Sequence, residues 1–214
     1  MSLKPLIYLA SASPRRSQLL AQIGVAHEVR PAAIDESVQP GEDPATYVER
    51  LARSKAESLW DQLLPADRLP VLGADTTVVL GKLMLGKPAN GAESLTMLDQ
   101  LSGRTHQVFT AVALRSEAGC ESRVSVSNVT FRDLGKRESE AYAATSEPLD
   151  KAGGYAVQGL AAVFITRIAG SYSGIMGLPL SETAELLAAI GWTPFATARP
   201  VTQQAAAVHA RAAS

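Results

Sequence analysis

The sequence predicts a mixed α/β protein, and three observations support this expectation. Residues 6–10 form an apolar run that is followed by a polar turn and an amphipathic stretch, which is a strand–turn–helix unit. Residues 69–80, LPVLGADTTVVL, are typical of a buried strand. The strands expected over 106–114 and 123–131 are joined by a polar turn, as in a hairpin. Early alternation of strands with helices and later hairpins favour a mixed sheet.

The first half of the chain alternates strands with helices. A helix is expected over residues 14–23, because Ser13 can cap it and a proline suits its first position. Residues 25–30 are a second candidate strand. The next helix starts at Pro44 by the same logic, and its apolar stripe lies within residues 47–60.

The second half contains shorter elements. Apolar periodicity and the Gly, Asn and Ser residues between the runs predict a strand over 83–85, a helix over 91–101, strands over 106–114 and 123–131, a helix over 138–145, a strand over 163–168 and a helix over 181–190. Residues 196–214 are rich in alanine and lack a strong apolar face, so we expect a flexible tail there. The remaining residues, 1–195, are expected to form a single domain.

Composition and charge exclude some classes of function and partner. The chain has 214 residues and a formal net charge of −1, so it lacks the excess positive charge that favours nucleic-acid polymers or membrane surfaces. Cys120 is the only cysteine, which precludes an intrachain disulfide and fits a reducing compartment. No apolar run reaches about 18 residues, and the N-terminus does not resemble a signal peptide. We therefore expect a cytoplasmic protein without membrane or nucleic-acid partners.

Two adjacent arginines follow the first strand in the motif SASPRR. Cations are unfavourable at a helix start, because the helix dipole is positive there. Free N–H groups at the same place bind anions, and the side chains of Ser11, Ser13, Arg15 and Arg16 add donors that suit phosphate oxygens. Two interpretations remain open, a phosphate site and a pair of solvated arginines on a surface helix.

Acidic residues in two segments of the chain are candidates for chemistry. Asp75 interrupts an apolar segment, where a carboxylate is costly unless it is paired or binds a metal. It is either a base or metal ligand that faces a cleft, or a residue in a turn after Gly73. Asp35 and Glu36 precede the Pro44 helix. Adjacent carboxylates are usually solvated, although Mg²⁺ carried by nucleotide phosphates commonly uses only one or two protein carboxylates.

Three lysines and one amide are further candidates. Lys55 lies four residues from two leucines of the apolar stripe, so it either snorkels along the edge of the stripe or points into a cleft. Lys87 in LGKP and Lys151 in LDKAGG lie in glycine-flanked loops, where a lysine is usually a surface residue. Gln158 in YAVQGL can donate to and accept from the edge of a base. The sequence has no CxxC, HExxH or GxSxG motif, which argues against a Cys/His metal cage.

Together these segments resemble the Maf family of nucleoside triphosphate pyrophosphatases. The matching motifs, in order over about residues 6–191, are SASPRRSQLL, IDES, YVERLARSKA, GADT, GKP, SGRTHQVFTAV, LDKAGGYAVQG and GLPL. The resemblance implies hydrolysis of a nucleoside triphosphate to a monophosphate and pyrophosphate with a divalent metal, Mg²⁺ or Mn²⁺. It also implies a homodimer and a link to cell-division arrest. The implied fold resembles that of inosine triphosphatases, with two lobes, a long mixed sheet, flanking helices and a deep central cleft.

The resemblance assigns the chemical roles. It makes Asp75 the catalytic base, with Glu36, Lys55 and Lys87 as further catalytic residues. It also makes Glu36 and Asp75 the metal ligands. Arg16 matches a phosphate contact.

The resemblance also suggests a substrate. Arg15, Thr76 and Gln158 match the branch that acts on dTTP and UTP, whereas the 7-methyl-GTP branch has a tryptophan after SP, then SDQ and EG. The expected activity is therefore hydrolysis of dTTP and UTP, with Ser11, Ser13, Arg15, Arg16, Thr76, Lys151 and Gln158 as substrate-binding residues. A pyrophosphatase for modified nucleotides and a non-catalytic nucleotide-binding regulator of division are the rival hypotheses.

Overall fold

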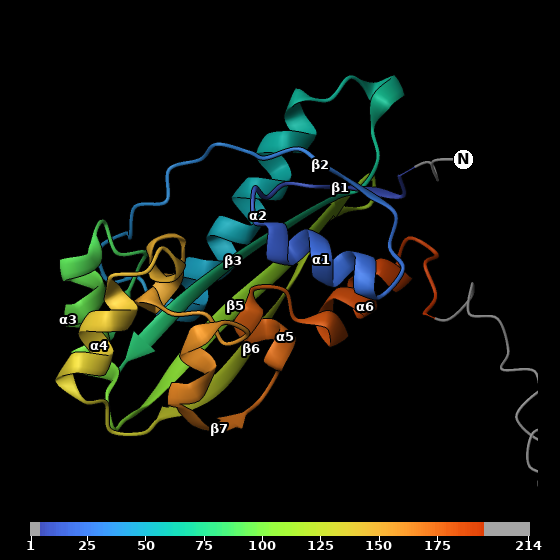
Figure 1. Ribbon diagram of the computed structural model, residues 1–214. Coiled ribbons are helices and arrows are strands. Elements are labelled where there is room, and N and C mark those ends of the chain that lie inside the picture. The colour runs from blue at the N-terminus through green and yellow to red at the C-terminus, as the bar shows by residue number, and fades with distance from the viewer. Residues whose placement is uncertain (1–4, 195–214) are drawn as a thin grey trace, which may run out of the picture.

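A seven-stranded sheet forms the centre of the protein in the computed structural model, which describes residues 5–194 (Figure 1). Its order is β2–β1–β3–β5–β6–β7, and β4 pairs with one end of β3. β1 is parallel to β2 and β3, whereas the other pairs are antiparallel, so the sheet is mixed as predicted. The strands are β1 (Ile7–Leu9), β2 (His27–Val29), β3 (Val71–Leu80), β4 (Leu83–Leu85), β5 (Thr105–Ser116), β6 (Gly119–Phe131) and β7 (Ile165–Ala169).

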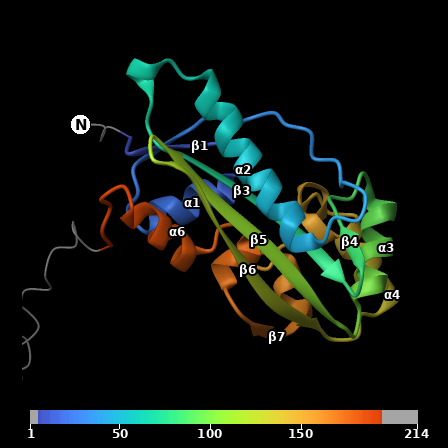
Figure 2. The same cartoon turned by 180° about the vertical axis from the view of Figure 1, so that it is seen from behind.

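Helices cover both faces of this sheet. α2 lies across one face, and α1, α5 and α6 lie on the other (Figures 1 and 2). α3 and α4 pack against each other beside the far end of the long strands. The helices are α1 (Pro14–Gln22), α2 (Pro44–Gln62), α3 (Gly91–Leu101), α4 (Lys136–Ala143), α5 (Tyr172–Met176) and α6 (Leu180–Ala188), with short 3₁₀ turns η1 (Pro65–Asp67), η2 (Glu147–Asp150), η3 (Ala152–Gly154) and η4 (Leu160–Phe164).

Local sequence explains where the helices begin. The Asp43 carboxylate accepts hydrogen bonds from the first free N–H groups of α2, and Asn90 does the same for α3. Ser13 occupies the position before α1, but its side chain makes no capping hydrogen bond. Pro14 is therefore the local sequence feature that marks the start of α1.

The apolar core divides into two main clusters along the long strands. One cluster packs α1 and α6 against the β3 segment that contains Leu72 and Ala74. The other packs α3 and α4 against the opposite end of the sheet, around Val78 and Phe131. β3 and β5 contribute side chains to both clusters, and the residues of β3 between them line the site described below.

Gly73 brings α2 close to β3. A Cβ atom at this position would overlap the carbonyl oxygen of Ala52 and lie 2.9 Å from the amide nitrogen of Ala56. Only a glycine fits between the strand and this turn of the helix. β3 continues without interruption through Asp75, so the interpretation of Asp75 as a turn residue is wrong.

Other differences from the sequence-based expectation are local. The hairpin turn is tighter than expected, because β6 already starts at Gly119, and Cys120 therefore lies in the strand opposite Arg115. α5 was not predicted, since five residues are too few for a helical period to emerge. The expected tail, 196–214, lies outside the described residues. Within the described part, no helix is both long and apolar enough to cross a membrane.

Candidate active site

A cavity of about 580 Å³ opens along one edge of β3. β1 covers this edge up to Leu72, and β4 covers it from Val78 onward. Residues 73–77 therefore have β5 on one side and, in the described part of the chain, no strand on the other. Successive side chains of a strand point to opposite faces, and this gap lets both Asp75 and Thr76 line the cavity.

The eleven residues that the resemblance assigns to the site all line this one cavity. Asp35, the other acidic candidate, does not, and its exposed carboxylate accepts hydrogen bonds from the amide and the hydroxyl of Ser37. The eleven residues come from the β1–α1 turn, the start of α1, the loop before α2, α2 itself, β3, the loop after β4 and the segment between η2 and η4, and they are Ser11, Ser13, Arg15, Arg16, Glu36, Lys55, Asp75, Thr76, Lys87, Lys151 and Gln158. The structure thus brings these eleven residues together, and the role of each remains a prediction.

Lys55 connects two carboxylates in this cavity. Its Nζ lies 2.7 Å from Asp75 Oδ1 and 2.6 Å from Glu36 Oε1. Lys55 and Asp75 are only 8% and 7% exposed, so their ion pair is largely screened from water. The side chain therefore points into the cavity and does not snorkel along the helix. Burial raises the pKa of Glu36, but Lys55, Lys87 and Arg16 outweigh this effect and hold that pKa below its ordinary value.

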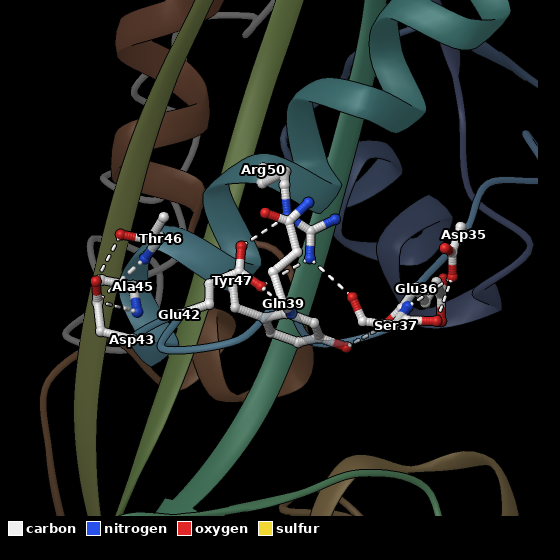
Figure 3. A network of polar contacts seen from close by, with 10 residues as sticks. All are labelled: Asp35, Glu36, Ser37, Gln39, Glu42, Asp43, Ala45, Thr46, Tyr47 and Arg50. Carbon is white, nitrogen blue, oxygen red and sulfur yellow. Dashed lines mark hydrogen bonds and ion pairs between the residues drawn. The ribbon is translucent and has the colours of Figure 1, made fainter.

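The loop that carries Glu36 is tied to the first turns of α2 (Figure 3). The Tyr47 hydroxyl donates to the Glu36 carbonyl oxygen at 3.0 Å. Arg50 Nη2 donates to the Ser37 carbonyl oxygen at 3.0 Å, and Arg50 Nε pairs with Glu42 at 2.6 Å. These contacts place the Glu36 carboxylate opposite Lys55 even though the loop has no regular secondary structure.

Three hydrogen bonds to other residues hold the guanidinium of Arg16 in place. Its Nε donates to the Gly177 carbonyl oxygen at 2.8 Å, Nη1 to Ser11 Oγ at 2.9 Å and Nη2 to Thr76 Oγ1 at 3.3 Å. Burial lowers the pKa of Arg16, although a guanidinium stays charged in proteins. The interpretation of Arg16 as a solvated surface residue is therefore wrong. A guanidinium has five N–H groups, so two remain for a ligand.

Arg15 and Lys151 share a carboxylate that the sequence reading missed. Arg15 Nη1 lies 3.4 Å from Asp150 Oδ2, and Lys151 Nζ pairs with Asp150 Oδ1. Lys151 Nζ also donates to the Glu147 carbonyl oxygen at 2.6 Å. These contacts join α1 to η2 across the cavity. Asp150 stands beside Lys151 in LDKAGG, and this was the only hint of its role. Sequence alone does not distinguish such a carboxylate from an ordinary surface charge.

The loops that carry Lys87 and Lys151 are joined through their backbones. The amide of Gly153 donates to the Gly86 carbonyl oxygen at 2.9 Å. A side chain at Gly153, whose φ is +71°, would press against Val78, so this approach of backbone to strand requires glycine.

The Gln158 loop is anchored on both sides. On one side, the Glu147 carboxylate accepts the amide of Leu160 at 2.9 Å and occupies the space that a side chain at Gly159 would need. On the other, the hydroxyl of Tyr155 lies 2.8 Å from Nε2 of the buried His106. Burial lowers the pKa of His106 to about 4, so this imidazole is neutral near pH 7. Sequence reasoning did not find the His106–Tyr155 pair.

The negatively charged groups that line this cavity are the carboxylates of Glu36, Asp75 and Asp150. Glu36 and Asp75 face the same ammonium of Lys55. Within residues 5–194, no group of three His, Cys, Asp or Glu side chains is arranged to hold a metal by itself. Two carboxylates suit a hard divalent cation that completes its coordination with phosphate and water oxygens, and they do not suit a zinc cage.

The fold and the site define a mixed α/β protein with a cavity for a polyanionic ligand, because cationic side chains from separate elements meet there beside a paired carboxylate. The family model described as "Maf-like protein" matches residues 6–190. The chain belongs to the Maf-like family.

Curated relatives match most of the chain. A dTTP/UTP pyrophosphatase of Nitrosomonas europaea is 50% identical over an alignment of 201 residues that covers 88% of this chain and 96% of the relative. A dTTP/UTP pyrophosphatase of Aromatoleum aromaticum is 51% identical over an alignment of 199 residues that covers 87% of this chain and 96% of the relative. A solved nucleoside-triphosphatase, or dITP/XTP pyrophosphatase, of Mycobacterium abscessus is 16% identical, with a TM-score of 0.38 over 58% of this chain and 73% of that chain. That likeness is too weak to carry a conclusion.

Proposed function

We propose that the protein hydrolyses dTTP and UTP to the monophosphate and pyrophosphate and so removes them from nucleotide pools. The observation that carries the proposal is the cavity along β3, where a nearly buried carboxylate–lysine pair faces cations from several elements. Membership of the Maf-like family and relatives named dTTP/UTP pyrophosphatase give independent support.

The cations of the cavity would bind the triphosphate. Arg15, Arg16, Lys87 and Lys151 all line it, and guanidinium groups suit phosphate oxygens because they offer paired donors in one plane. Asp150 pairs with both Arg15 and Lys151, and its single negative charge offsets one of their two positive charges. The triphosphate would take over these contacts, so the positive charge would be available where negative charge develops during the reaction.

Asp75 would act as the general base. In this mechanism its carboxylate takes a proton from a water molecule, the water oxygen bonds to phosphorus, and the phosphoanhydride bond to the leaving pyrophosphate breaks. Lys55 holds Asp75 in place and keeps its negative charge favourable in a largely dry site. Glu36 would assist from the other side of the same ammonium.

A divalent cation, Mg²⁺ or Mn²⁺, is part of the proposal. Glu36 and Asp75 would hold it together with phosphate oxygens of the nucleotide, since their donor set is oxygen alone. When bound, such a cation supplies neutralisation of phosphate charge.

The base would be recognised at the Gln158 end of the cavity. The amide of Gln158 can donate and accept, which suits the edge of a pyrimidine. Glu147 and Tyr155 hold the loop on both sides of Gln158 in one conformation. A rigid loop can discriminate between bases, because a mismatched edge leaves polar groups unpaired.

Pyrophosphate release from a panel of nucleoside triphosphates tests the function. With Mg²⁺ or Mn²⁺ we expect the highest kcat/KM for dTTP and UTP, and activity should vanish with a chelator. A preference for 7-methyl-GTP would overturn the substrate assignment, and no turnover of any triphosphate would overturn the proposal that the protein is an enzyme.

We also propose that the protein is a cytoplasmic homodimer. Light scattering of the purified protein would test the oligomeric state, and cell fractionation would test the location.

A further inference from the structure

Thr110 on β5 connects two parts of the site from a fully buried position. Its side chain is 0% exposed. Its hydroxyl oxygen lies 2.8 Å from the carbonyl oxygen of Gly174 in α5 and 3.1 Å from Thr76 Oγ1 on β3. None of the roles proposed above uses this residue.

The two contacts of Thr110 end at groups with fixed hydrogen-bonding character. A carbonyl oxygen only accepts, so the Thr110 hydroxyl donates to Gly174. A guanidinium only donates, so Arg16 Nη2 donates to Thr76 Oγ1. Thr76 therefore lies between Arg16 and Thr110, and its hydroxyl is engaged inside the protein from both sides.

Thr110 supports two of the three contacts that hold Arg16. It fixes the hydroxyl of Thr76, which binds Nη2. It also fixes α5 through Gly174, and the turn that follows α5 presents the Gly177 carbonyl oxygen to Arg16 Nε. The third contact, from Ser11 to Nη1, does not involve Thr110.

We propose that Thr110 is a positioning residue that sets the orientation of the Arg16 guanidinium and thereby the binding of the phosphate chain. The inference rests on the proposed function, in which Arg16 contacts phosphate. It gives Thr76 a different task from the one its sequence suggests. Thr76 acts on the substrate through Arg16, and it does not select the base by direct contact.

Matched variants separate the hydroxyl from the shape of the side chain. Thr110→Val removes the hydroxyl and keeps the branched shape, whereas Thr110→Ser keeps the hydroxyl. Thr105→Val is the control, because Thr105 lies on the same strand and its hydroxyl pairs with Thr130 at 2.8 Å on the exposed surface. We expect Thr110→Val to raise KM about tenfold, with Thr110→Ser and Thr105→Val near wild type.

The rise in KM caused by Thr110→Val should be equal for all nucleoside triphosphates, since all of them carry the same phosphate chain. A double-mutant cycle provides the decisive readout. In an Arg16→Met background, Thr110→Val should change KM no further, because its effect passes through Arg16. Additive effects in the cycle, or a KM change confined to one base, would overturn the inference.

Binding of inorganic pyrophosphate, measured by calorimetry, keeps the two proposals apart. Wild-type protein should bind pyrophosphate more tightly than Thr110→Val, even if no nucleotide is hydrolysed. A wild type that binds pyrophosphate without turnover would refute the proposed function alone. Equal pyrophosphate affinity of the wild type and Thr110→Val, both folded by thermal melting, would refute the role of Thr110 alone.

Discussion

Lys55 Nζ and Asp75 Oδ1 are 2.7 Å apart, and the two side chains come from a helix and a strand that cross at a glycine. The pair is almost closed to water, so each charge depends on the other. Glu36 completes the arrangement from a loop at the more exposed side.

Asp75→Asn should abolish turnover and retain nucleotide binding. The amide keeps the shape of the side chain but cannot take a proton from water, and loss of a general base typically lowers kcat by roughly 10²–10⁴-fold. Equilibrium binding of dTTP and single-turnover kinetics measure the two effects. Asp61→Asn, an exposed carboxylate on α2, is the control. Wild-type kcat in Asp75→Asn would remove this residue from the role of base, while wild-type protein that binds dTTP without turnover would point to a non-catalytic regulator.

Lys55→Met should destabilise the fold as well as the site. It leaves Asp75 buried without its partner and facing Glu36, and breaking a buried pair costs about 3 kcal/mol. The pKa of Glu36 should rise, because Lys55 helps to hold it low. Chemical denaturation and carboxyl titration by NMR measure these changes.

Lys136→Met is the control for Lys55→Met, since Lys136 lies on the surface. Part of the lost stability should return when Asp75→Asn is added, because the amide carries no charge to bury. An equal loss in the two single lysine variants would contradict the prediction.

Gly73→Ala should force α2 away from β3. The added methyl group would overlap the backbone of α2 at Ala52, and backbone cannot move aside as a flexible side chain can. We expect a loss of at least about 2 kcal/mol in the free energy of unfolding, together with a fall in kcat. Gly135→Ala is a suitable comparison, because a methyl group there meets no atom within 4 Å. A Gly73→Ala protein as stable and active as Gly135→Ala would show that the close contact is dispensable.

His106 should make the protein less stable in acid. Its pKa is about 4 in the folded state and near 6.5 when unfolded, so the unfolded chain binds the extra proton first. Stability is fully present above pH 6.5 and falls as the pH drops towards 4, by roughly 3 kcal/mol in total. His106→Gln should flatten this part of the stability curve, measured by denaturation at a series of pH values. A His106→Gln protein with the same slope as the wild type would contradict the assignment.

Sequence patterns predicted most of the regular elements, because these depend on local periodicity and caps. β3 and α2 are examples, since a long apolar run and an Asp43–Pro44 start mark them clearly. The start of β6 was predicted too late, at residue 123 instead of Gly119, because a polar stretch looks like a turn even when it continues a strand. The short helix α5 left no signal of its own.

The site was predictable as a set of residue types but not as a set of contacts. Asp75 stood out because it interrupts an apolar strand, and the residues suggested beside it line the same cavity. The partners of Arg16 could not be read from the sequence, since Gly177 is 161 positions away. His106 and Tyr155 are likewise 49 positions apart, and only the folded chain joins them.

The hairpin of β5 and β6 has a mechanical consequence. Its register is continuous from Thr105–Thr130 to Ser116–Gly119, and it runs past both apolar clusters. A hinge between the part of the sheet at one apolar cluster and the part at the other would have to break hydrogen bonds between β5 and β6. The two parts therefore cannot rotate apart as rigid bodies at low cost. We therefore expect a ligand to enter and leave beside residues 73–77 of β3, past the segments that carry Glu36, Lys87 and Lys151.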